Sequence, residues 1–533
     1  MRILGIEGTA WAASAAVFAY DPDDPTPLDA TNPVIETDAY QPESGGIHPR
    51  EAAEHMGEAI PTVIETALDA ADGPIDAVAF SRGPGLGPCL RIVGTAARAL
   101  AGTLDVPLVG VNHMVAHLEI GRHGAGFDSP VCLNASGANA HLLGYHDGRY
   151  RVLGETMDTG VGNAIDKFTR HVGWSHPGGP KVEAAAADGE YVDLPYVVKG
   201  MDFSFSGLMS AAKDAYDEGT PVEDVCFSLQ ETIFAMLTEV AERALSLTGS
   251  TELVLGGGVG QNERLREMLS TMCADRGAAF YAPAARYLRD NAGMIAVLGA
   301  KMCAAGETIT VGESAVDPNF RPDEVAVAWR SDESVAIDPV ETTERQGAEA
   351  VVTVEADRVI KRRLPKAYRH PALDARLRRE RTVAEARLTS EARRRGVPTP
   401  VVRDVDVAEA TLTLDRIGDR DLAAALTPAR ARVVGAHLAT LHDVGIVHGD
   451  PTVRNVRIGG GRCYLIDFGL GYHSGHVEDH AMDCHVFEGS VRGTVAAADA
   501  ENALSAFEAG YAEAGDGAVL SRLREVEGRG RYQ

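Results

Sequence analysis

Short apolar runs that end in glycine-containing turns dominate the first ~320 residues of this chain. Arg2–Gly5 leads into the turn Glu7–Ala10, after which Ala13–Ala19 resumes the apolar pattern. The same order recurs where Val131–Leu133 runs into a turn and Ala140–Tyr145 leaves it. Such runs predict buried strands, and strands that alternate with helices predict an α/β fold. The two related hairpins suggest either an internal duplication or a chance likeness between two common motifs.

The pattern changes near residue 325. Residues 325–346 are rich in acidic residues and have little apolar periodicity, which predicts a linker and the entry to a new domain. Between Arg358 and Arg395, 14 basic residues are accompanied by only four acidic ones. This local surplus predicts either a surface for nucleic acid or phosphate, or a solvated helix with internal ion pairs.

The chain as a whole is strongly acidic. Its formal net charge of −27 comes from 77 acidic and 50 basic residues, and only seven of the basic residues are lysines. An acid-rich, lysine-poor surface suits solvation at high salt, so we expect the cytoplasm of a halophile. Such a charge argues against a simple nucleic-acid binder at low ionic strength, but says less at molar salt, where charges are screened.

Nothing in the sequence predicts export or a membrane span. Met1–Tyr20 is apolar, but Glu7 interrupts it and no signal-peptidase site follows, so a buried strand is the better interpretation. The seven cysteines are scattered and form no C-x-x-C pair, which indicates reduced intracellular thiols. We therefore expect a cytoplasmic protein that does not bind membranes.

Two histidines at helical spacing are candidate metal ligands. His113 and His117 would lie on one face of a helix, a spacing that can bind one metal ion but is also common without a metal. Met114 stands where the zinc-protease motif requires glutamate, which argues against a protease. Asp290, just before a predicted helix start at Ala292, could supply a third ligand. The glycine-rich turns of this region lack the G-K-[ST] ending, so a P-loop is excluded.

Six segments in a fixed order resemble a known family. They are Gly45–His55, Gly83–Leu90, Val111–Arg122, Gly200–Leu208, Gly256–Asn262 and Asp290–Ala296. Together they resemble the universal tRNA threonylcarbamoyladenosine transferase family, in its archaeal and eukaryotic branch, over about residues 1–323. The resemblance implies the duplicated α/β fold of actin, Hsp70 and sugar kinases. It also implies transfer of threonylcarbamoyl from threonylcarbamoyl-AMP to the N6 amine of the adenosine beside the anticodon, in tRNAs that read codons beginning with A.

The resemblance also implies site residues. His113, His117 and Asp290 would bind one divalent metal ion, with iron favoured and zinc possible. Threonylcarbamoyl-adenylate would be bound by Asn134, Ala135, Ser136, Gly137, Ala138, Asp166, Gly179, Glu183 and Asn262. The family usually has a tyrosine, often a metal ligand, at the position of Asn134. Either the Asn134 amide oxygen or a water could take that place.

The C-terminal ~190 residues contain an ordered pair of kinase motifs. His448-Gly-Asp450 is followed by Asn455 and then by Asp467-Phe-Gly469, which matches the catalytic and metal loops of protein kinases. We expect Asp450 to act as base or to position the hydroxyl, and Asn455 and Asp467 to bind Mg²⁺.

Upstream, the sequence predicts the ATP-binding side of this site. A strand-like run, Val351–Ile360, ends in Lys361, and Glu385 in a predicted helix would be the partner of that lysine. A minimal loop replaces the usual glycine-rich cover, so ATP would be contacted by Gly347, Ala348, Glu349, Ala350, Val351 and Val352.

This region lacks parts of an ordinary kinase. Few residues follow Gly469 and there is no A-P-E motif, so a full activation segment does not fit. Residues 343–533 resemble the small atypical kinase of the KEOPS complex, which implies a small bilobal α+β domain. The segment Arg381–Ala386 and the basic tail Arg529–Arg531 agree with this resemblance. The family further implies small partner subunits for dimerisation and for kinase control, and a separate enzyme that makes the acyl-adenylate.

The combined interpretation is a bifunctional tRNA-modification enzyme. Residues 1–323 would form the transferase, 324–342 a linker, and 343–533 an atypical serine/threonine kinase or ATPase that uses ATP and Mg²⁺ to regulate or support the transfer. In this context the basic stretch, including Arg378, Arg379 and Arg381, is expected to face tRNA. The alternative is an ATPase or chaperone-like protein of the actin/Hsp70 type with a regulatory kinase. A non-catalytic scaffold is disfavoured because the expected kinase residues are all present.

Overall fold

The computed structural model describes residues 1–23, 33–40, 48–137, 139–146, 148–330, 344–495 and 497–529. These residues form two compact units. Unit 1 consists of the described parts of Met1–Val197 and Phe203–Ile337, and unit 2 of those of Val198–Asp202 and Asp338–Arg531. Ala138, most of the predicted linker and Arg531 lie outside the described residues.

Unit 1 is built on two five-stranded sheets with the same connectivity. The first has the order β3-β2-β1-β4-β5, and the second has the order β8-β7-β6-β11-β12. In each sheet the first three strands of the chain are antiparallel, and the last two run parallel to the first. The strands are Arg2–Glu7 (β1), Ala12–Ala19 (β2), Val34–Ala39 (β3), Ala77–Gly83 (β4), Leu108–Asn112 (β5), Val131–Ala135 (β6), Ala140–His146 (β7), Arg149–Glu155 (β8), Glu252–Gly256 (β11) and Ala279–Tyr281 (β12). The predicted α/β class and both predicted hairpins are confirmed, and the repeated strand order supports an internal duplication.

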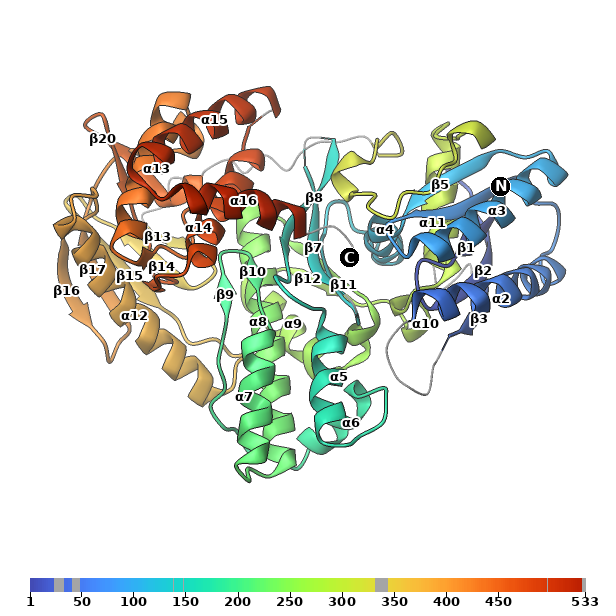
Figure 1. Cartoon of the computed structure of the whole chain (residues 1–533), viewed down its shortest axis with the longest axis horizontal. Coiled ribbons are helices and arrows are strands. Elements are labelled where there is room, and N and C mark those ends of the chain that lie inside the picture. Colours follow the sequence, from blue (N-terminus) through green and yellow to red (C-terminus); the bar gives the residue numbers. More distant parts are fainter. Residues whose placement is uncertain are drawn as a thin grey trace. The chain divides into compact units, whose positions relative to one another are not determined.

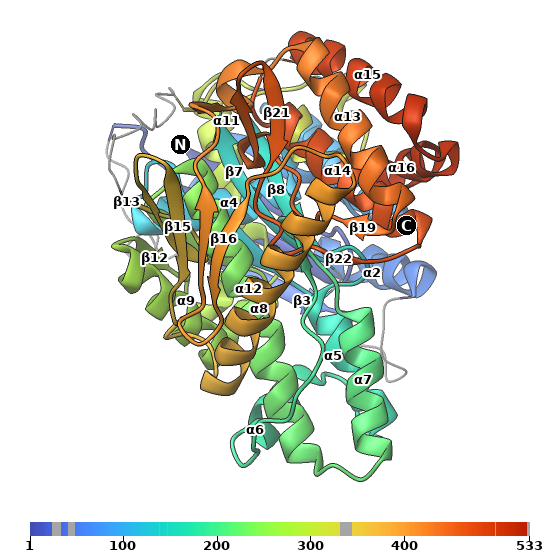
Figure 2. The same cartoon turned by 90° about the vertical axis from the view of Figure 1, so that its left-hand side faces the viewer.

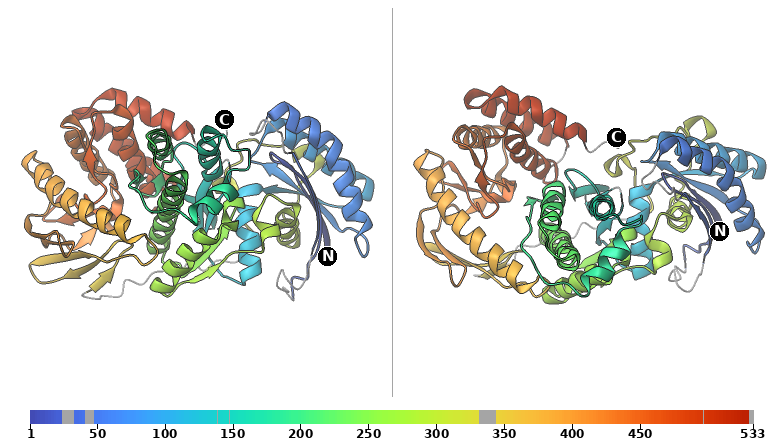
Figure 3. Two further views of the ribbon diagram at one scale, coloured as in Figure 1. Left: turned by 90° about the horizontal axis from the view of Figure 1, so that it is seen from below. Right: turned by 60° about the horizontal axis from the view of Figure 1, so that its bottom comes forward.

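Helices cover both faces of the first sheet. Figure 3 shows α2 (Pro49–Asp69) and α3 (Gly87–Leu104) on one face and α11 (Ala292–Ala304) on the other. Along β1, Leu4 and Ile6 pack into the core with α2 and α3, whereas Ile3 packs into the core that contains α11. Gly5 permits a close approach of α11, since a Cβ atom there would lie 2.5 Å from the Ala292 carbonyl oxygen. The start of α11 is therefore held directly against the centre of the sheet.

The remaining helices of unit 1 connect and cover the second sheet. Helix α4 contacts β5, β11 and α11, so it joins elements of both sheets. Helices α5 to α8 pack on one another at one end of the unit (Figure 2). Their bounds are His113–Ala125 (α4), Val161–His171 (α5), Gly179–Ala186 (α6), Ser206–Asp217 (α7), Val222–Thr248 (α8), Glu263–Arg276 (α9) and Ala285–Leu288 (α10), with short 3₁₀ turns at Gly258–Gln261 (η1), Val311–Glu313 (η2) and Pro322–Glu324 (η3). A two-stranded hairpin, Val198–Lys199 (β9) and Asp202–Phe203 (β10), follows α6 in the chain.

Unit 2 begins with an antiparallel sheet and one long helix. The sheet has the order β13-β14-β15-β17-β16, and α12 (Pro371–Arg394) lies along it (Figure 1). Its strands are Glu344–Gln346 (β13), Ala350–Val354 (β14), Arg358–Arg363 (β15), Val402–Asp406 (β16) and Thr411–Asp415 (β17). The predicted single strand Val351–Ile360 is wrong, because residues 355–357, which include Glu355 and Asp357, turn the chain and split the run into the hairpin β14–β15. Lys361 therefore lies inside a strand and not at its end.

The rest of unit 2 is mainly helical. Helices α13 and α15 pack together, as do α14 and α16. The elements are Arg420–Asp421 (β18), Ala423–Ala425 (η4), Pro428–Asp443 (α13), Ile446–Val447 (β19), Val453–Asn455 (η5), Val456–Gly459 (β20), Arg462–Leu465 (β21), Tyr472–His473 (β22), Val477–Arg492 (α14), Ala497–Ala514 (α15) and Gly517–Arg529 (α16). Among the described residues of both units, no helix is long and apolar enough to cross a membrane.

Candidate functional site

The two histidines of the candidate metal centre lie at the start of a helix. Strand β5 ends at Asn112, and α4 begins at His113 with no intervening loop. The Asn112 side chain accepts hydrogen bonds from the N–H groups of Met114 and Val115, which caps the helix. The end of a buried strand thus fixes the first two turns of α4, which carry His113 and His117.

Asp290 lies at the start of another helix. It directly precedes Asn291, whose side chain caps α11 by accepting a hydrogen bond from the N–H of Met294 at 3.3 Å. The N–H of Ala292 donates to Ser14 Oγ at 3.0 Å, which ties the start of α11 to β2. A carboxylate near a helix N-terminus is stabilised by the helix dipole. The predicted helix start at Ala292 is confirmed.

The three predicted ligands converge. Asp290 Oδ1 lies 3.2 Å from His117 Nε2 and 3.4 Å from His113 Nε2. The three donor atoms lie within 4.8 Å of one another, and both imidazoles are buried. Two imidazole nitrogens and one carboxylate oxygen form a donor set that suits a divalent transition metal. The arrangement therefore fits a single metal ion, whose identity the donor set leaves open between iron and zinc.

The charges near the centre affect its two imidazoles differently. Burial disfavours a charged imidazole, yet the carboxylates of Glu7 and Asp290 raise the pKa of His113 to about 10. For His117, burial outweighs the bond to Asp290 and lowers the pKa. Despite its own burial, Asp290 has a pKa below its usual range because the two imidazoles stabilise its carboxylate. The centre therefore presents an ionised carboxylate, the form that binds a metal ion.

The predicted substrate loop begins beside this centre. Asn134, near the end of β6, is buried, and its Oδ1 atom has no hydrogen-bond partner among the described residues. A Cβ atom added to Gly256 would lie 3.5 Å from that Oδ1 atom and 3.7 Å from Cβ of His117. The end of β6 and helix α4 thus meet at Gly256. This places Asn134 next to the candidate metal centre, although no contact with the three ligands singles it out as a fourth.

Helix α5 holds the loop that follows β6. The N–H of Gly162 donates to the carbonyl of Ser136 at 3.2 Å, and that of Asn163 donates to the carbonyl of Gly137 at 2.9 Å. Ala135 is the last residue of β6, and its carbonyl would clash with any Cβ atom at Gly257, which has φ +84°. The loop is therefore closely packed between a glycine turn and a helix N-terminus.

The other predicted substrate residues gather around two helix starts in unit 1. Asp166 of α5 accepts a hydrogen bond from the N–H of Gly178 at 2.8 Å, just before Gly179 opens α6. Glu183 of α6 accepts from the N–H of Glu263 at 3.0 Å, at the start of α9. Asn262 caps α9 and donates to Gln230 Oε1 at 3.1 Å. The structure thus links α5 to α6 and α6 to α9 through the predicted nucleotide-binding side chains.

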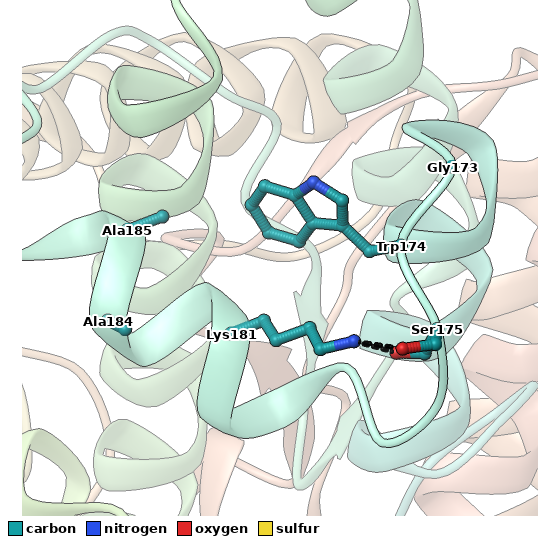
Figure 4. A pocket seen from close by; sticks show the side chains of 6 residues that line it. All are labelled: Gly173, Trp174, Ser175, Lys181, Ala184 and Ala185. Carbon is teal, nitrogen blue, oxygen red and sulfur yellow. Dashed lines mark hydrogen bonds between the residues drawn. The ribbon is translucent and has the colours of Figure 1, made fainter.

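An open hollow of about 620 Å³ lies between α6 and the segment that follows α5. Figure 4 shows its lining, which consists of Gly173, Trp174, Ser175, Lys181, Ala184 and Ala185. Lys181 Nζ donates to the Ser175 carbonyl at 2.6 Å, so its ammonium group is engaged within the wall. None of the six lining residues is a predicted site residue.

In unit 2, Lys361 is bound by two acids. Its Nζ atom lies 3.0 Å from Oε2 of Glu385 in α12 and 2.6 Å from Oδ1 of Asp467. Arg363, buried two residues further along β15, donates to the same Glu385 carboxylate at 2.5 Å. Burial opposes these charges, but the ion pairs raise the pKa of Lys361 and lower that of Asp467. The structure therefore brings together Lys361, Glu385 and Asp467.

The predicted catalytic loop and metal loop of unit 2 are also linked. Asn455 Nδ2 donates to the carbonyl oxygen of Asp450 at 2.8 Å and to its Oδ2 atom at 2.9 Å. The carbonyl of Asn455 accepts from the N–H of Ile466, the residue before Asp467, at 2.9 Å. Asp467 itself has φ +65°, a left-handed conformation that is unusual outside glycine and often found at functional sites.

The predicted ATP-facing loop lies across from the lysine strand. Gly347 donates its N–H to the carbonyl of Ala350 at 2.9 Å and closes a turn that includes Ala348. Val351 and Val352 follow in β14, where Val352 pairs with Lys361. Glu349 bonds to Arg381 of α12, which fastens the turn to that helix.

Two buried acids contribute to these centres without belonging to any motif. Glu7 contacts His113, and its only sequence signal is a charge inside an apolar run. Asp483 of α14 accepts the N–H groups of His448 and Gly449 at 2.6 and 2.8 Å and so holds the catalytic loop in place. No spacing in the sequence relates Asp483 to this loop, because the contact is purely tertiary.

The expectation that Arg381 faces tRNA is wrong, because its side chain is buried. Arg378 is paired with Asp374 at 2.8 Å, and Arg381 is buried against Glu349. Arg378 is half-buried and pairs within its own helix, whereas Arg379 is exposed. Further along the helix, Arg387 and Arg394 are exposed as well. The basic stretch therefore combines internal ion pairs with a separate exposed face.

Comparison with known proteins places this chain among tRNA-modifying proteins. The family described as tRNA N6-adenosine threonylcarbamoyltransferase matches residues 31–297. A protein of Halobacterium salinarum is 73% identical over 100% of this chain and 99% of its own length. Proteins of Haloquadratum walsbyi and Methanospirillum hungatei are 68% and 51% identical, over 100% and 99% of both chains. All three are described as probable bifunctional tRNA threonylcarbamoyladenosine biosynthesis proteins.

Proposed function

Because this chain belongs to the family of bifunctional tRNA threonylcarbamoyladenosine biosynthesis proteins, we propose that two separate domains carry out threonylcarbamoyl transfer and phosphoryl transfer. The first activity is that of a tRNA N6-adenosine threonylcarbamoyltransferase. The transferase domain would span residues 1–323, in the fold of actin, Hsp70 and sugar kinases, and would act in the cytoplasm. A linker over 324–342 would lead to a bilobal kinase domain over 343–533.

The donor of the transferase reaction is threonylcarbamoyl-AMP in this proposal. The acceptor is the N6 amine of the adenosine beside the anticodon, in tRNAs that read codons beginning with A. The amine forms a bond to the carbamoyl carbon, the bond from that carbon to the phosphate oxygen breaks, and AMP leaves with its electron pair while the amine loses a proton.

His113, His117 and Asp290 would hold one divalent ion, iron or zinc, in this reaction. A bound ion would polarise the carbamoyl group or the phosphate leaving group as a Lewis acid. The convergence of these three side chains is the observation that carries the proposal, since both Nε2 atoms turn toward one carboxylate oxygen.

The acyl-adenylate would lie between the β6 loop and the starts of α6 and α9. The backbone of residues 134–138 would bind its acyl and phosphate parts, because closely packed glycine turns let amides approach a ligand. Asp166 and Glu183 would take the ribose hydroxyls. Gly179 and Asn262 would face the remainder of the nucleotide.

The kinase domain would bind ATP between the turn 347–350 and Lys361. Lys361, held by Glu385, would bind the phosphates, and Asn455 and Asp467 would bind Mg²⁺. Asp450 would position the accepting hydroxyl or water. We propose that this serine/threonine kinase or ATPase activity regulates or supports the transfer within the KEOPS complex, together with a dimerisation subunit and a kinase-regulating subunit.

Mass spectrometry of tRNA nucleosides tests the proposal. Unmodified tRNA is incubated with threonylcarbamoyl-AMP and the full-length chain, and the modified adenosine is measured. The wild type should produce it, Asp290→Ala should not, and Asp290→Ala should also lose its bound metal. Full metal content together with full modification in Asp290→Ala would rule out the metal assignment.

A second variant tests whether the kinase domain supports the transferase reaction. Asp450→Ala should abolish ATP turnover and reduce tRNA modification when the protein is limiting. If it abolished phosphorylation of an added protein but left tRNA modification unchanged, the kinase would not support the transfer.

A further inference from the structure

Glu7 is a buried acid that ends the first strand of unit 1. It is 0% exposed, and its two carboxylate oxygens have different partners. Oε1 accepts the N–H and the hydroxyl of Thr9 at 2.8 and 2.6 Å, whereas Oε2 lies 3.2 Å from His113 Nδ1. One oxygen thus fixes the carboxylate to its own chain, and the other is directed at a candidate metal ligand.

The sheet brings these residues together. Strands β1, β4 and β5 are parallel neighbours, so their carboxyl ends lie along one edge. Glu7 is the last residue of β1, and His113 follows directly after the last residue of β5. Both ends are buried parts of the sheet, so the distance between them is set by strand pairing and not by a flexible loop.

The two imidazoles of the centre differ in what their second nitrogen meets. The Nε2 atoms of His113 and His117 both face Asp290 Oδ1. Nδ1 of His113 faces Glu7, but Nδ1 of His117 is buried with no partner among the described residues. Glu7 therefore contacts the nitrogen of the His113 ring that is turned away from Asp290, which leaves Nε2 for the ion.

We propose that Glu7 is the positioning residue of the metal centre. Its carboxylate accepts the Nδ1–H of His113, which selects the tautomer that presents the Nε2 lone pair to the ion and prevents the ring from turning. This inference rests on the proposed metal binding by His113, His117 and Asp290. Hydrogen-bonded partners of ligating histidines typically change metal affinity by about 10- to 100-fold.

Cobalt binding tests this role without measuring activity. Metal-free full-length protein is titrated with Co²⁺ in the presence of a competing chelator, and the visible ligand-field bands are recorded. We expect Glu7→Gln to weaken Co²⁺ binding by roughly 10- to 100-fold and to alter the bands. Glu7→Ala, which removes the acceptor altogether, should be weaker still. Wild-type affinity and bands in both variants would overturn the proposal.

One further variant separates positioning from folding. Glu119→Gln removes another buried carboxylate of unit 1, one that contacts Lys301 and Tyr150 instead of the metal ligands. It should bind Co²⁺ like the wild type, even if it unfolds at a lower temperature. If Glu119→Gln weakened Co²⁺ binding as much as Glu7→Gln, the effect would be one of general destabilisation and the proposal would fail.

A double variant tests whether Glu7 acts through His113. In the His113→Ala background, Glu7→Gln should cause no further loss of Co²⁺ affinity, because the group that it positions is gone. A further loss of the same size would show that Glu7 acts independently and would overturn the positioning role. If His113→Ala and Asp290→Ala both kept wild-type Co²⁺ affinity, the proposed metal centre itself would be wrong, an outcome distinct from the failure of Glu7 alone.

Discussion

The key carboxylates of the two chemical centres have different partners. In unit 1, Asp290 faces two imidazole nitrogens at 3.2 and 3.4 Å. In unit 2, Asp467 faces the ammonium group of Lys361 at 2.6 Å, and Glu385 also binds that group. Imidazole nitrogens and a carboxylate can bind one metal ion together. An ammonium group has no lone pair for a metal, and is itself the cation that pairs with the carboxylate. The first centre would thus take up a metal ion on loss of the His113 proton, with its side chains already converged. In the second, Asp467 would exchange Lys361 for the proposed Mg²⁺.

The two centres also differ in the backbone that carries their key side chains. The candidate ligands of unit 1 lie at the capped starts of α4 and α11. Strand β5 leads directly into α4, and the N–H of Ala292 ties the start of α11 to Ser14 of β2. In unit 2, Asp467 lies in a loop with a left-handed backbone, and its carboxylate pairs with Lys361. Side chains that already converge can bind an ion without moving. A carboxylate that leaves one partner for another can instead respond to the binding of the nucleotide.

Removing the carboxylate of the second centre should have the largest effect. Asp467→Asn takes away a proposed Mg²⁺ ligand, and a bound metal stabilises the transferring phosphate by several kcal/mol. We therefore expect ATP turnover to fall by roughly 1,000-fold. Release of inorganic phosphate from ATP is the measurement. Metal content of the transferase domain is the control and should not change, and loss of that metal would contradict the separation of the two centres.

Glu119 is a third buried carboxylate that can be compared with Asp467. Glu119 in unit 1 resembles Asp467, because it is bound by Lys301 at 2.8 Å and by Arg122 at 2.9 Å, but it lies in no predicted site. Breaking such a buried pair leaves an uncompensated charge, so Glu119→Gln should lower the free energy of unfolding by about 3 kcal/mol. Chemical denaturation at neutral pH measures this loss.

The loss of unfolding free energy in Glu119→Gln should become smaller as the pH falls. Burial opposes ionisation, but Lys301 and Arg122 hold the pKa of Glu119 below its usual range. The stabilisation is therefore complete above the unfolded pKa of about 4.3 and is lost as the pH falls toward the folded pKa. The difference between wild type and Glu119→Gln should shrink under acid conditions. A difference that stayed constant at lower pH would contradict an ion pair as its cause.

The smallest expected effect concerns the exposed face of α12. Reversing the charge of Arg379, Arg387 and Arg394 should reduce the salt dependence of tRNA binding, by about 1 in the slope for each phosphate that the helix no longer neutralises. Binding is measured over a series of KCl concentrations. Arg432→Glu on α13, which is also exposed, is the matched control. An unchanged slope in the triple variant would make this face an ordinary solvated helix.

Much of the local structure could be predicted because it depends on neighbours in the chain. The hairpins of β1–β2 and β6–β7 follow from apolar runs, and the spacing of His113 and His117 indicates the helix that carries them. The helix start at Ala292 was also predicted. The prediction of one strand over Val351–Ile360 was wrong because the apolar residues on both sides of the turn masked it in the sequence. Arg381 was misjudged because a run of arginines does not indicate which of them face the sheet.

The amino-acid sequence by itself determined the order of elements, the histidine pair one helical turn apart, and the kinase motifs, since these depend on spacing along one segment. Only the tertiary structure decided that Asp290 meets both histidines, that Glu7 meets His113, and that Asp483 holds the loop of Asp450. These contacts join residues far apart in the chain. Their distances are set by sheet register and helix packing, which arise from the whole core and not from any one motif.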